Sequence, residues 1–174
     1  MEEKTRVKVV PAEAGRVAMA RLQRDTDLVT GIIKVCREAG FEMAASQLII
    51  GSLRRAEISW TRPSDKTKRG SERTPAMPIA GPLELISAQA EVCLTDPERP
   101  VFHVHGVVTD ADGKAWGGHF FKGGNPVHAT VDIVMNEIKG GYMKWTQDDE
   151  IDLELPVPYS NCLLYTSDAA DEAR

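Results

Sequence analysis

Three histidines lie close together in the chain, with a spacing that suits a metal site. His103 and His105 are separated by one residue, and His119 completes a segment of 17 residues. Imidazole nitrogens are preferred ligands of Zn²⁺, and catalytic zinc has three protein ligands with a fourth position open to water. The pattern predicts a divalent metal site, with zinc as the expected ion, at His103, His105 and His119. The alternative is a structural role, in which the histidines only hydrogen-bond across a hairpin.

Two strands and a tight turn must position these histidines. Residues 101–109 and 114–122 both have strand-like sequences, and the Asp and Gly residues of segment 110–113 are typical of a turn. Two strands joined so closely must pair antiparallel. Because side chains two positions apart on a strand share a face, His103 and His105 are expected to point the same way.

The position of the third histidine depends on the length of the loop. A five-residue loop, residues 110–114, places His119 opposite His105 and on the same face. A four-residue loop places His119 opposite Val104, and a shift of one residue reverses the face of every side chain. A bulge at Gly117-Gly118 could restore the face, because glycine is typical of bulges. Two of these three arrangements bring the imidazoles together.

Other ionisable side chains are weaker candidates. Glu84 and Asp112 could act as an acid or base near a bound metal, provided that the fold brings them to the histidines. His128 opens a predicted strand over residues 128–138, but it lies in the phase opposite the apolar residues of that strand. We therefore expect His128 to lie at the surface rather than to act as an additional ligand.

The rest of the chain is predicted to be mostly strands with one clear helix. The helix covers residues 28–39, where apolar residues recur at helical spacing after the N-cap candidates Asp25-Thr26-Asp27 and before Gly40, which is placed to end the helix. A turn near Gly51-Ser52 is expected to separate two of the strands. The remaining strands are predicted over residues 5–10, 16–22, 44–50, 54–61, 83–94, 142–146 and 150–155.

A basic loop raises the question of nucleic acid. Residues 62–73 contain five Lys and Arg residues, in a longer loop predicted over residues 62–82. The segment lacks the aromatic residues on which bases stack, and the net charge of the chain is −5. A solvated connector is therefore favoured over a DNA-contacting loop.

Length and composition limit the number of domains and the cellular compartment that the protein can have. A chain of 174 residues fits one domain with its own core. Its three cysteines, Cys36, Cys93 and Cys162, are far apart and form no CxxC pair, which is typical of free thiols in a reducing cytoplasm. No apolar run is long enough for a membrane span, and the N-terminus has no signal-like apolar segment. We expect a cytoplasmic protein without a membrane partner.

Several segments together resemble one known family, the PPC (plant and prokaryote conserved) domain, also called domain of unknown function 296. The resemblance covers roughly residues 6–155 and rests on six segments of the sequence. These segments are Arg21-Leu22 with Asp27-Leu28, Ala39-Gly40-Phe41, Ile49-Ile50-Gly51-Ser52-Leu53, Gly81-Pro82-Leu83-Glu84-Leu85-Ile86-Ser87, His103-Val104-His105 and Gly117-Gly118-His119.

The resemblance implies an α/β domain of the α+β type, with a largely antiparallel sheet flanked by helices and assembled as a homotrimer. It also implies that the histidine cluster can hold a metal, as in bacterial members. Plant members carry AT-hook segments that bind DNA, and this chain has no such Arg-Gly-Arg core. A DNA role is accordingly disfavoured, although prokaryotic relatives are often described as DNA-binding.

The end of the chain differs in composition from the rest. Residues 164–172 resemble a peptide that arises when sequencing-adapter sequence is translated at the end of a gene fragment. We therefore expect a PPC-like domain over residues 1–158 and a disordered, non-native tail over residues 159–174. The favoured function is a trimeric protein with a three-histidine metal site, whose reaction or small-molecule ligand the sequence does not specify. The alternatives are a DNA-associated regulator and a protein-interaction scaffold with structural histidines.

Overall fold

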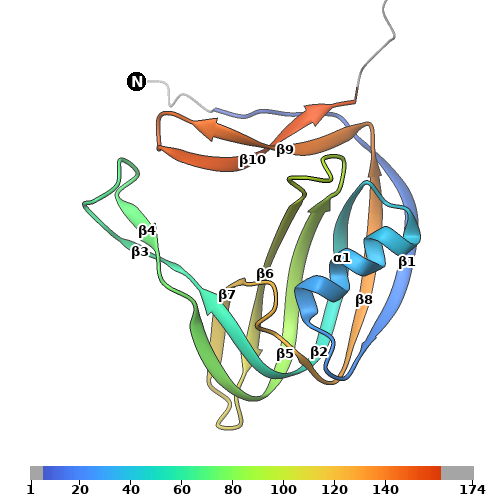
Figure 1. The fold of residues 1–174 in the computed structure, drawn as a ribbon, viewed down its shortest axis with the longest axis vertical. Helices are drawn as coiled ribbons and strands as arrows, with labels where there is room; N and C mark the ends of the chain where they lie inside the picture. The colour runs from blue at the N-terminus through green and yellow to red at the C-terminus, as the bar shows by residue number, and fades with distance from the viewer. Residues whose placement is uncertain (1–5, 162–174) are drawn as a thin grey trace, which may run out of the picture.

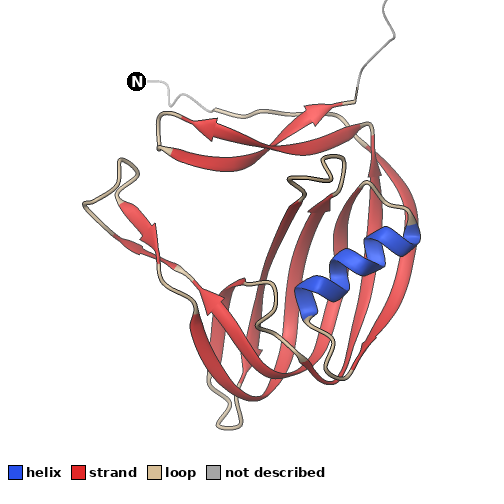
Figure 2. Cartoon of the chain, viewed as in Figure 1, coloured by secondary structure: helices blue, strands red, loops and turns tan. Residues whose placement is uncertain are grey.

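The computed structural model describes residues 6–161, which form a curved antiparallel main sheet, one helix against it and two separate two-stranded hairpins (Figures 1 and 2). Six strands make the sheet in the order β1-β8-β2-β5-β6-β7. The predicted fold class, a largely antiparallel α+β domain, is confirmed, with one helix within the described range. The sheet strands are β1 (Glu13–Gln23), β2 (Met43–Ser59), β5 (Met77–Cys93), β6 (Val101–Thr109), β7 (Ala115–Phe120) and β8 (Val127–Lys139).

The helix α1 (Leu28–Ala39) forms as its sequence predicts. The Asp27 side chain accepts a hydrogen bond from the Thr30 backbone N–H at 2.9 Å, which caps the first turn. Gly40 ends the helix in the left-handed region at φ 67°. The apolar stripe, which includes the fully buried Leu28 and Ile32, packs against one face of the sheet and forms the main core.

The prediction of two short strands around a turn at Gly51-Ser52 is wrong. β2 runs without interruption from Met43 to Ser59 and pairs with β8, β5 and, at its end, β7. Gly51 has φ 151°, and a Cβ there would lie 2.2 Å from the Thr130 carbonyl oxygen. The glycine therefore marks a close approach of two strands rather than a turn.

The predicted loop over residues 62–82 is also partly wrong. Two short strands, β3 (Thr61–Pro63) and β4 (Ser71–Arg73), pair into a hairpin that projects from the sheet (Figure 1). β5 then begins at Met77, earlier than residue 83. The apolar and small residues before Leu83 pair with β2, so the local Pro and Gly residues do not prevent strand formation there.

Segments at both ends of the described chain cross one end of the sheet. The predicted strand over residues 5–10 is wrong for residues 6–10, which join no strand and leave Val7 and Val9 about 70% exposed. β9 (Gly141–Asp148) and β10 (Leu153–Ser160) form a separate hairpin, and Met143 and Trp145 pack on the buried residues Cys93 and Val101.

The last strand differs from its prediction. β10 begins at Leu153 and continues through Pro156 and Pro158 to Ser160, because these residues lie in a two-stranded ribbon where Pro is tolerated. Tyr159 and Ser160, which we assigned to the tail, are thus part of this strand. The rest of the predicted tail beyond Asn161, with Cys162, lies outside the described residues. No helix in the described part of the chain is both long and apolar enough to span a membrane.

Candidate metal centre

The hairpin of β6 and β7 has the five-residue loop that brings the histidines together. Thr109 pairs with Ala115, and His105 pairs directly with His119, with no register shift in the ladder. The bulge at Gly117-Gly118 is therefore not needed. Asp110 fixes the loop, because its side chain accepts hydrogen bonds from the Lys114 N–H at 2.9 Å and the Trp116 Nε1 at 3.0 Å.

The three imidazoles form one compact group on the sheet face opposite α1. The Nε2 atoms of His103 and His105 are 2.9 Å apart. The ring of His119 lies 5.3 Å, centroid to centroid, from each of the other two rings. One ligand nitrogen from each residue lies within 4.8 Å of the others, and within residues 6–161 this is the group of His, Cys, Asp and Glu side chains arranged to hold a metal.

Close strand packing holds His119 in place. The end of β2 pairs with β7, so that Ser59 lies opposite His119. A Cβ at Gly118 would lie 2.3 Å from the Ser59 carbonyl oxygen, so only glycine permits this approach. Gly106 pairs with Gly118, and a Cβ at Gly106 would lie 2.7 Å from the Ser87 carbonyl oxygen. The glycines beside the histidines therefore allow β6 and β7 to lie close to their neighbouring strands.

Burial keeps the histidines in the neutral form that binds metal. Burial and the nearby charges of Arg73, His103 and His105 lower the pKa of His119 to about 4. Burial also lowers the pKa of His103, helped by repulsion from His105 and Arg73, and it lowers the pKa of His105, helped by Arg73. Since only the neutral imidazole can coordinate an ion, these environments favour metal binding near neutral pH.

One nitrogen atom of the group lacks a hydrogen-bond partner in the described structure. The Nδ1 atom of His119 is buried and has no hydrogen-bond partner. A buried polar atom without a partner destabilises the folded chain, and such atoms are rare in native proteins. A bound cation at this group would be consistent with the orphaned nitrogen.

The other predicted site residues do not join the histidines. Glu84 is exposed on β5 and pairs with Thr109, four residues along β6 from His105, which is about 13 Å at strand spacing. Asp112 is exposed in the β6–β7 loop, and its N–H donates to Asp110. His128 on β8 is half-buried and lies outside the cluster.

Two residues of β5 that we did not single out lie next to the cluster. Gln89 pairs with His105, and Glu91 pairs with His103, so all four side chains share one face. Burial raises the pKa of Glu91, which favours its protonated form. The alternation of β5 places Gln89 and Glu91 in one phase, but the sequence alone does not reveal which strand lies beside β6.

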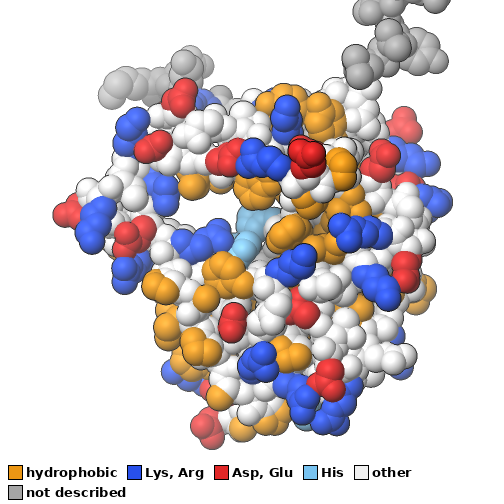
Figure 3. All heavy atoms as spheres, in the orientation of Figure 1, with side chains coloured by type: hydrophobic (Ala, Val, Ile, Leu, Met, Phe, Trp, Pro, Cys, Tyr) orange, Lys and Arg blue, Asp and Glu red, His pale blue; other side chains and the backbone are white. Residues whose placement is uncertain are grey.

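Two hollows flank the histidines. One, of about 260 Å³, is lined by Gln89, Ala90, Glu91, His103 and His105. The other, of about 440 Å³, lies between the β3–β4 hairpin and the β9–β10 hairpin and includes His103, His119, Arg69 and Arg73 in its lining. Figure 3 shows histidine side chains beside an opening that is bordered by basic and hydrophobic side chains.

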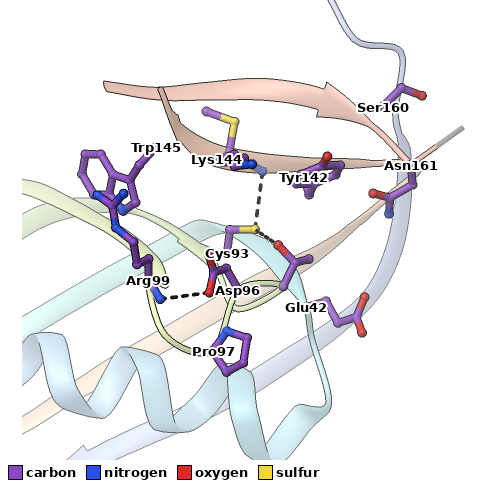
Figure 4. A pocket seen from close by; sticks show the side chains of 12 residues that line it. Glu42, Cys93, Asp96, Pro97, Arg99, Tyr142, Lys144, Trp145, Ser160 and Asn161 are labelled. Carbon is purple, nitrogen blue, oxygen red and sulfur yellow. Dashed lines mark hydrogen bonds between the residues drawn. The ribbon is translucent and has the colours of Figure 1, made fainter. Parts of the chain in front are cut away.

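A larger hollow, of about 830 Å³, lies under the other end of the β9–β10 hairpin (Figure 4). The buried Cys93 faces it, but the thiol already contacts the Thr95 hydroxyl at 3.3 Å and accepts from the Met143 N–H at 3.4 Å. Acidic and basic side chains, among them Glu42 and Lys144, both line this space. Its lining therefore does not group side chains of one chemical type, as the histidine cluster does.

Within residues 6–161, the fold and the site define a class of protein: a six-stranded antiparallel sheet covered by one helix, with three histidines on its β6–β7 hairpin. A family model of the Plants and Prokaryotes Conserved (PCC) domain matches residues 10–139, which is most of the chain. The chain belongs to this family, as its sequence segments indicate. No curated protein matches the chain in sequence.

Solved structures share the whole fold. A metal-containing protein from Archaeoglobus fulgidus is 26% identical, with a TM-score of 0.71, and the match covers 87% of this chain and 99% of that one. A plant- and prokaryote-conserved protein from Pyrococcus horikoshii is 24% identical over 87% and 99% of the two chains, with a TM-score of 0.67. A protein from Bacteroides thetaiotaomicron that is proposed to bind DNA is 14% identical over 84% and 96%, with a TM-score of 0.63.

Proposed function

We propose that this protein is a homotrimeric metal-binding protein in which His103, His105 and His119 hold one divalent ion, with zinc as the expected ion. The observation that carries the proposal is the convergence of three imidazoles, with one ligand nitrogen from each within 4.8 Å of the others. The buried Nδ1 of His119, which has no hydrogen-bond partner, supports it. The 26% identical protein from Archaeoglobus fulgidus is itself metal-containing, which supports a metal at this fold.

The spacing of the ligand atoms fits a tetrahedral ion. Zinc–nitrogen bonds of about 2.0–2.1 Å in tetrahedral geometry separate the nitrogens by about 3.3 Å. The closest pair here is 2.9 Å apart, and the whole set lies within 4.8 Å, so modest side-chain rotation reaches that spacing. Thiolate and carboxylate groups are absent from this group, and a neutral imidazole set suits zinc and other late transition ions better than calcium or magnesium.

A three-histidine set leaves one position of the ion open. A bound zinc ion polarises a ligand or lowers the pKa of a bound water, which is the chemistry that such open sites supply. Gln89 and Glu91 line the hollow on one side and can orient a bound molecule through hydrogen bonds. The role of acid or base that we expected of Glu84 or Asp112 is better suited to Glu91, because Glu91 lies directly opposite His103.

An apolar surface on the sheet supports the homotrimer. Met19, Val134 and Leu48 lie side by side across β1, β8 and β2 on the face opposite α1, and Met19 is 84% exposed. Ile50 and Val107 also present exposed apolar side chains, at 40% and 41%. A contiguous apolar surface is typical of an interface between subunits.

Cobalt substitution tests the metal site directly. Co²⁺ added to metal-free protein should give the intense visible bands of a tetrahedral ion, and equimolar Zn²⁺ should abolish them. The variant His105→Ala should lack these bands, whereas His128→Ala, which removes a histidine outside the cluster, should retain them. A wild-type spectrum identical to that of free Co²⁺, or equal spectra in both variants, would mean that the histidines are structural.

A DNA-associated role is the second candidate, favoured by the relatives that are proposed to bind DNA. The exposed Lys66 and Lys68 on the projecting hairpin are the residues that could contact phosphates. A gel shift with duplex DNA at physiological salt tests this role. Binding that disappears in the double variant Lys66→Gln/Lys68→Gln would support it, and no shift would exclude it.

The buried, free Cys36 and Cys93 are consistent with the proposed cytoplasmic location.

A further inference from the structure

Two arginines face the 440 Å³ hollow beside the histidines without an acidic partner. Arg69 and Arg73 both line it, from the β3–β4 hairpin. Arg69 is half-buried and Arg73 is exposed, and neither guanidinium has a hydrogen bond or ion pair within residues 6–161. Two unpaired guanidinium groups beside one cavity create a positive field that favours an anion.

The two acidic residues that line the same hollow already form ion pairs with arginines that lie outside it. Glu72 accepts from Arg62 Nε at 2.9 Å, and this contact holds the pKa of the Glu72 carboxyl below its ordinary value. Glu154 accepts from Arg99 through both of its oxygens at 2.9 Å. Since Arg62 and Arg99 do not line the hollow, the charge that remains uncompensated inside it belongs to Arg69 and Arg73.

The opposite wall of the hollow is apolar. Phe102 and Trp145 contribute aromatic rings, and Leu153, Leu155 and Pro156 contribute aliphatic surface from β10. A volume of about 440 Å³ is in the range of small-molecule sites, which combine such walls with a few polar groups that fix orientation. The polar groups here are the two arginines, His103, His119, Thr61, Ser71 and the two carboxylates already paired with Arg62 and Arg99.

We propose that this hollow binds a small organic anion, a carboxylate or phosphonate with an apolar or aromatic body. Its anionic group lies between Arg69 and Arg73, and its body rests against Phe102 and Trp145. His103 and His119 also line the hollow, so the anionic group would lie beside an ion held by the histidines. This last placement rests on the proposed metal site, whereas the pairing with the arginines does not.

The test uses three probes of similar shape: 3-phenylpropionate, phenylphosphonate and the neutral 3-phenylpropionamide. Calorimetric titration into zinc-loaded wild-type protein should show that the anions bind and that the amide binds at least tenfold more weakly. Arg73→Gln and Arg69→Gln should each weaken anion binding by roughly tenfold, because each removes a charge-assisted contact. Lys66→Gln is the matched control, since it removes a positive charge from the same hairpin but not from the hollow, and it should bind as the wild type does.

The same titrations into chelator-treated protein separate this inference from the metal proposal. Loss of affinity on metal removal, with the arginine dependence retained, supports both. Equal affinity with and without zinc, still dependent on Arg69 and Arg73, would support the anion site and argue against the metal contact. The inference is overturned if neither anion binds, if the amide binds equally well, or if both arginine variants behave like Lys66→Gln. Duplex DNA that binds through Arg73 while the probes do not bind would also overturn it, because the arginines would then serve phosphates of a polymer.

Discussion

His105 on β6 lies directly opposite His119 on β7, and the glycine pair Gly106–Gly118 follows immediately in the same ladder. This relationship sets the geometry of the whole candidate site. The two strands can lie this close to their neighbours because neither glycine has a side chain, and β2 closes against β7 at Ser59.

Adding a methyl group at Gly118 should therefore displace β7 and disturb the histidine site. The Cβ of Gly118→Ala would lie 2.3 Å from the Ser59 carbonyl oxygen, so β7 must move and carry His119 with it. Zinc affinity, measured by competition with a chromophoric chelator, should fall roughly tenfold or more, as with other changes that misorient ligands. Gly117→Ala is the control, because its nearest neighbours would be 3.5 Å away. Equal affinities in the two variants would contradict this account of the glycine.

Asn125 should be a strong determinant of stability. Its fully buried side chain accepts from the Glu57 N–H at 2.8 Å and donates to the Phe121 carbonyl, which ties the end of β7 to β2. Asn125→Ala would leave buried backbone groups without partners, so the free energy of unfolding should fall by about 1–3 kcal/mol. Urea denaturation measures the change. Gln47→Ala on the exposed side of β2 should alter stability little, and a similar loss in both variants would refute the role of Asn125.

Acid should weaken the link between β1 and β8. Arg16 donates to both oxygens of Glu137, at 2.9 and 3.0 Å, and these bonds lower the pKa of the Glu137 carboxyl to about 2. The pair stabilises the fold fully above the ordinary carboxyl pKa of 4.5, and the effect is lost as pH falls towards 2. Thermal unfolding should show Glu137→Gln less stable than wild type at pH 7. The difference should shrink between pH 4.5 and 2, and a difference that is constant over this range would contradict the assignment.

The apolar face should control the oligomeric state. Met19→Lys places a charge at the most exposed apolar residue of the sheet and should convert trimer to monomer, because an unpaired charge buried in an interface is costly. Light scattering coupled to size exclusion measures the mass. Val7→Lys, which changes an exposed apolar residue outside the sheet, should leave the trimer intact. A wild-type monomer would refute the assembly itself.

The local sequence was sufficient where short-range chemistry decides structure. Asp27 and Gly40 define the ends of α1, and the five-residue loop fixed by Asp110 sets the pairing of His105 with His119. These features depend on contacts between residues close in the chain. For that reason, the sequence could predict the histidine cluster in two of the three hairpin arrangements, although it left the loop length open.

Features that depend on distant pairing could not be predicted in this way. Gly51 looks like a turn residue, but the approach of Thr130 on β8 makes it part of a continuous strand. Glu91 and Arg73 reach the histidines only because β5 pairs with β6 and because the β3–β4 hairpin extends beside them. Glu84 and Asp112 carry suitable carboxyl groups, but neither belongs to the cluster that the sheet assembles.

Elemental analysis of the purified protein tests the central proposal most directly. The wild type, purified without chelator, should contain about one zinc or similar divalent ion per chain, and His128→Ala should contain the same amount. His105→Ala should lose the ion, because two imidazoles provide too few ligands to hold it through purification. Wild-type protein that remains free of metal even after incubation with Zn²⁺, or a His105→Ala variant that keeps a full equivalent, would contradict the metal site.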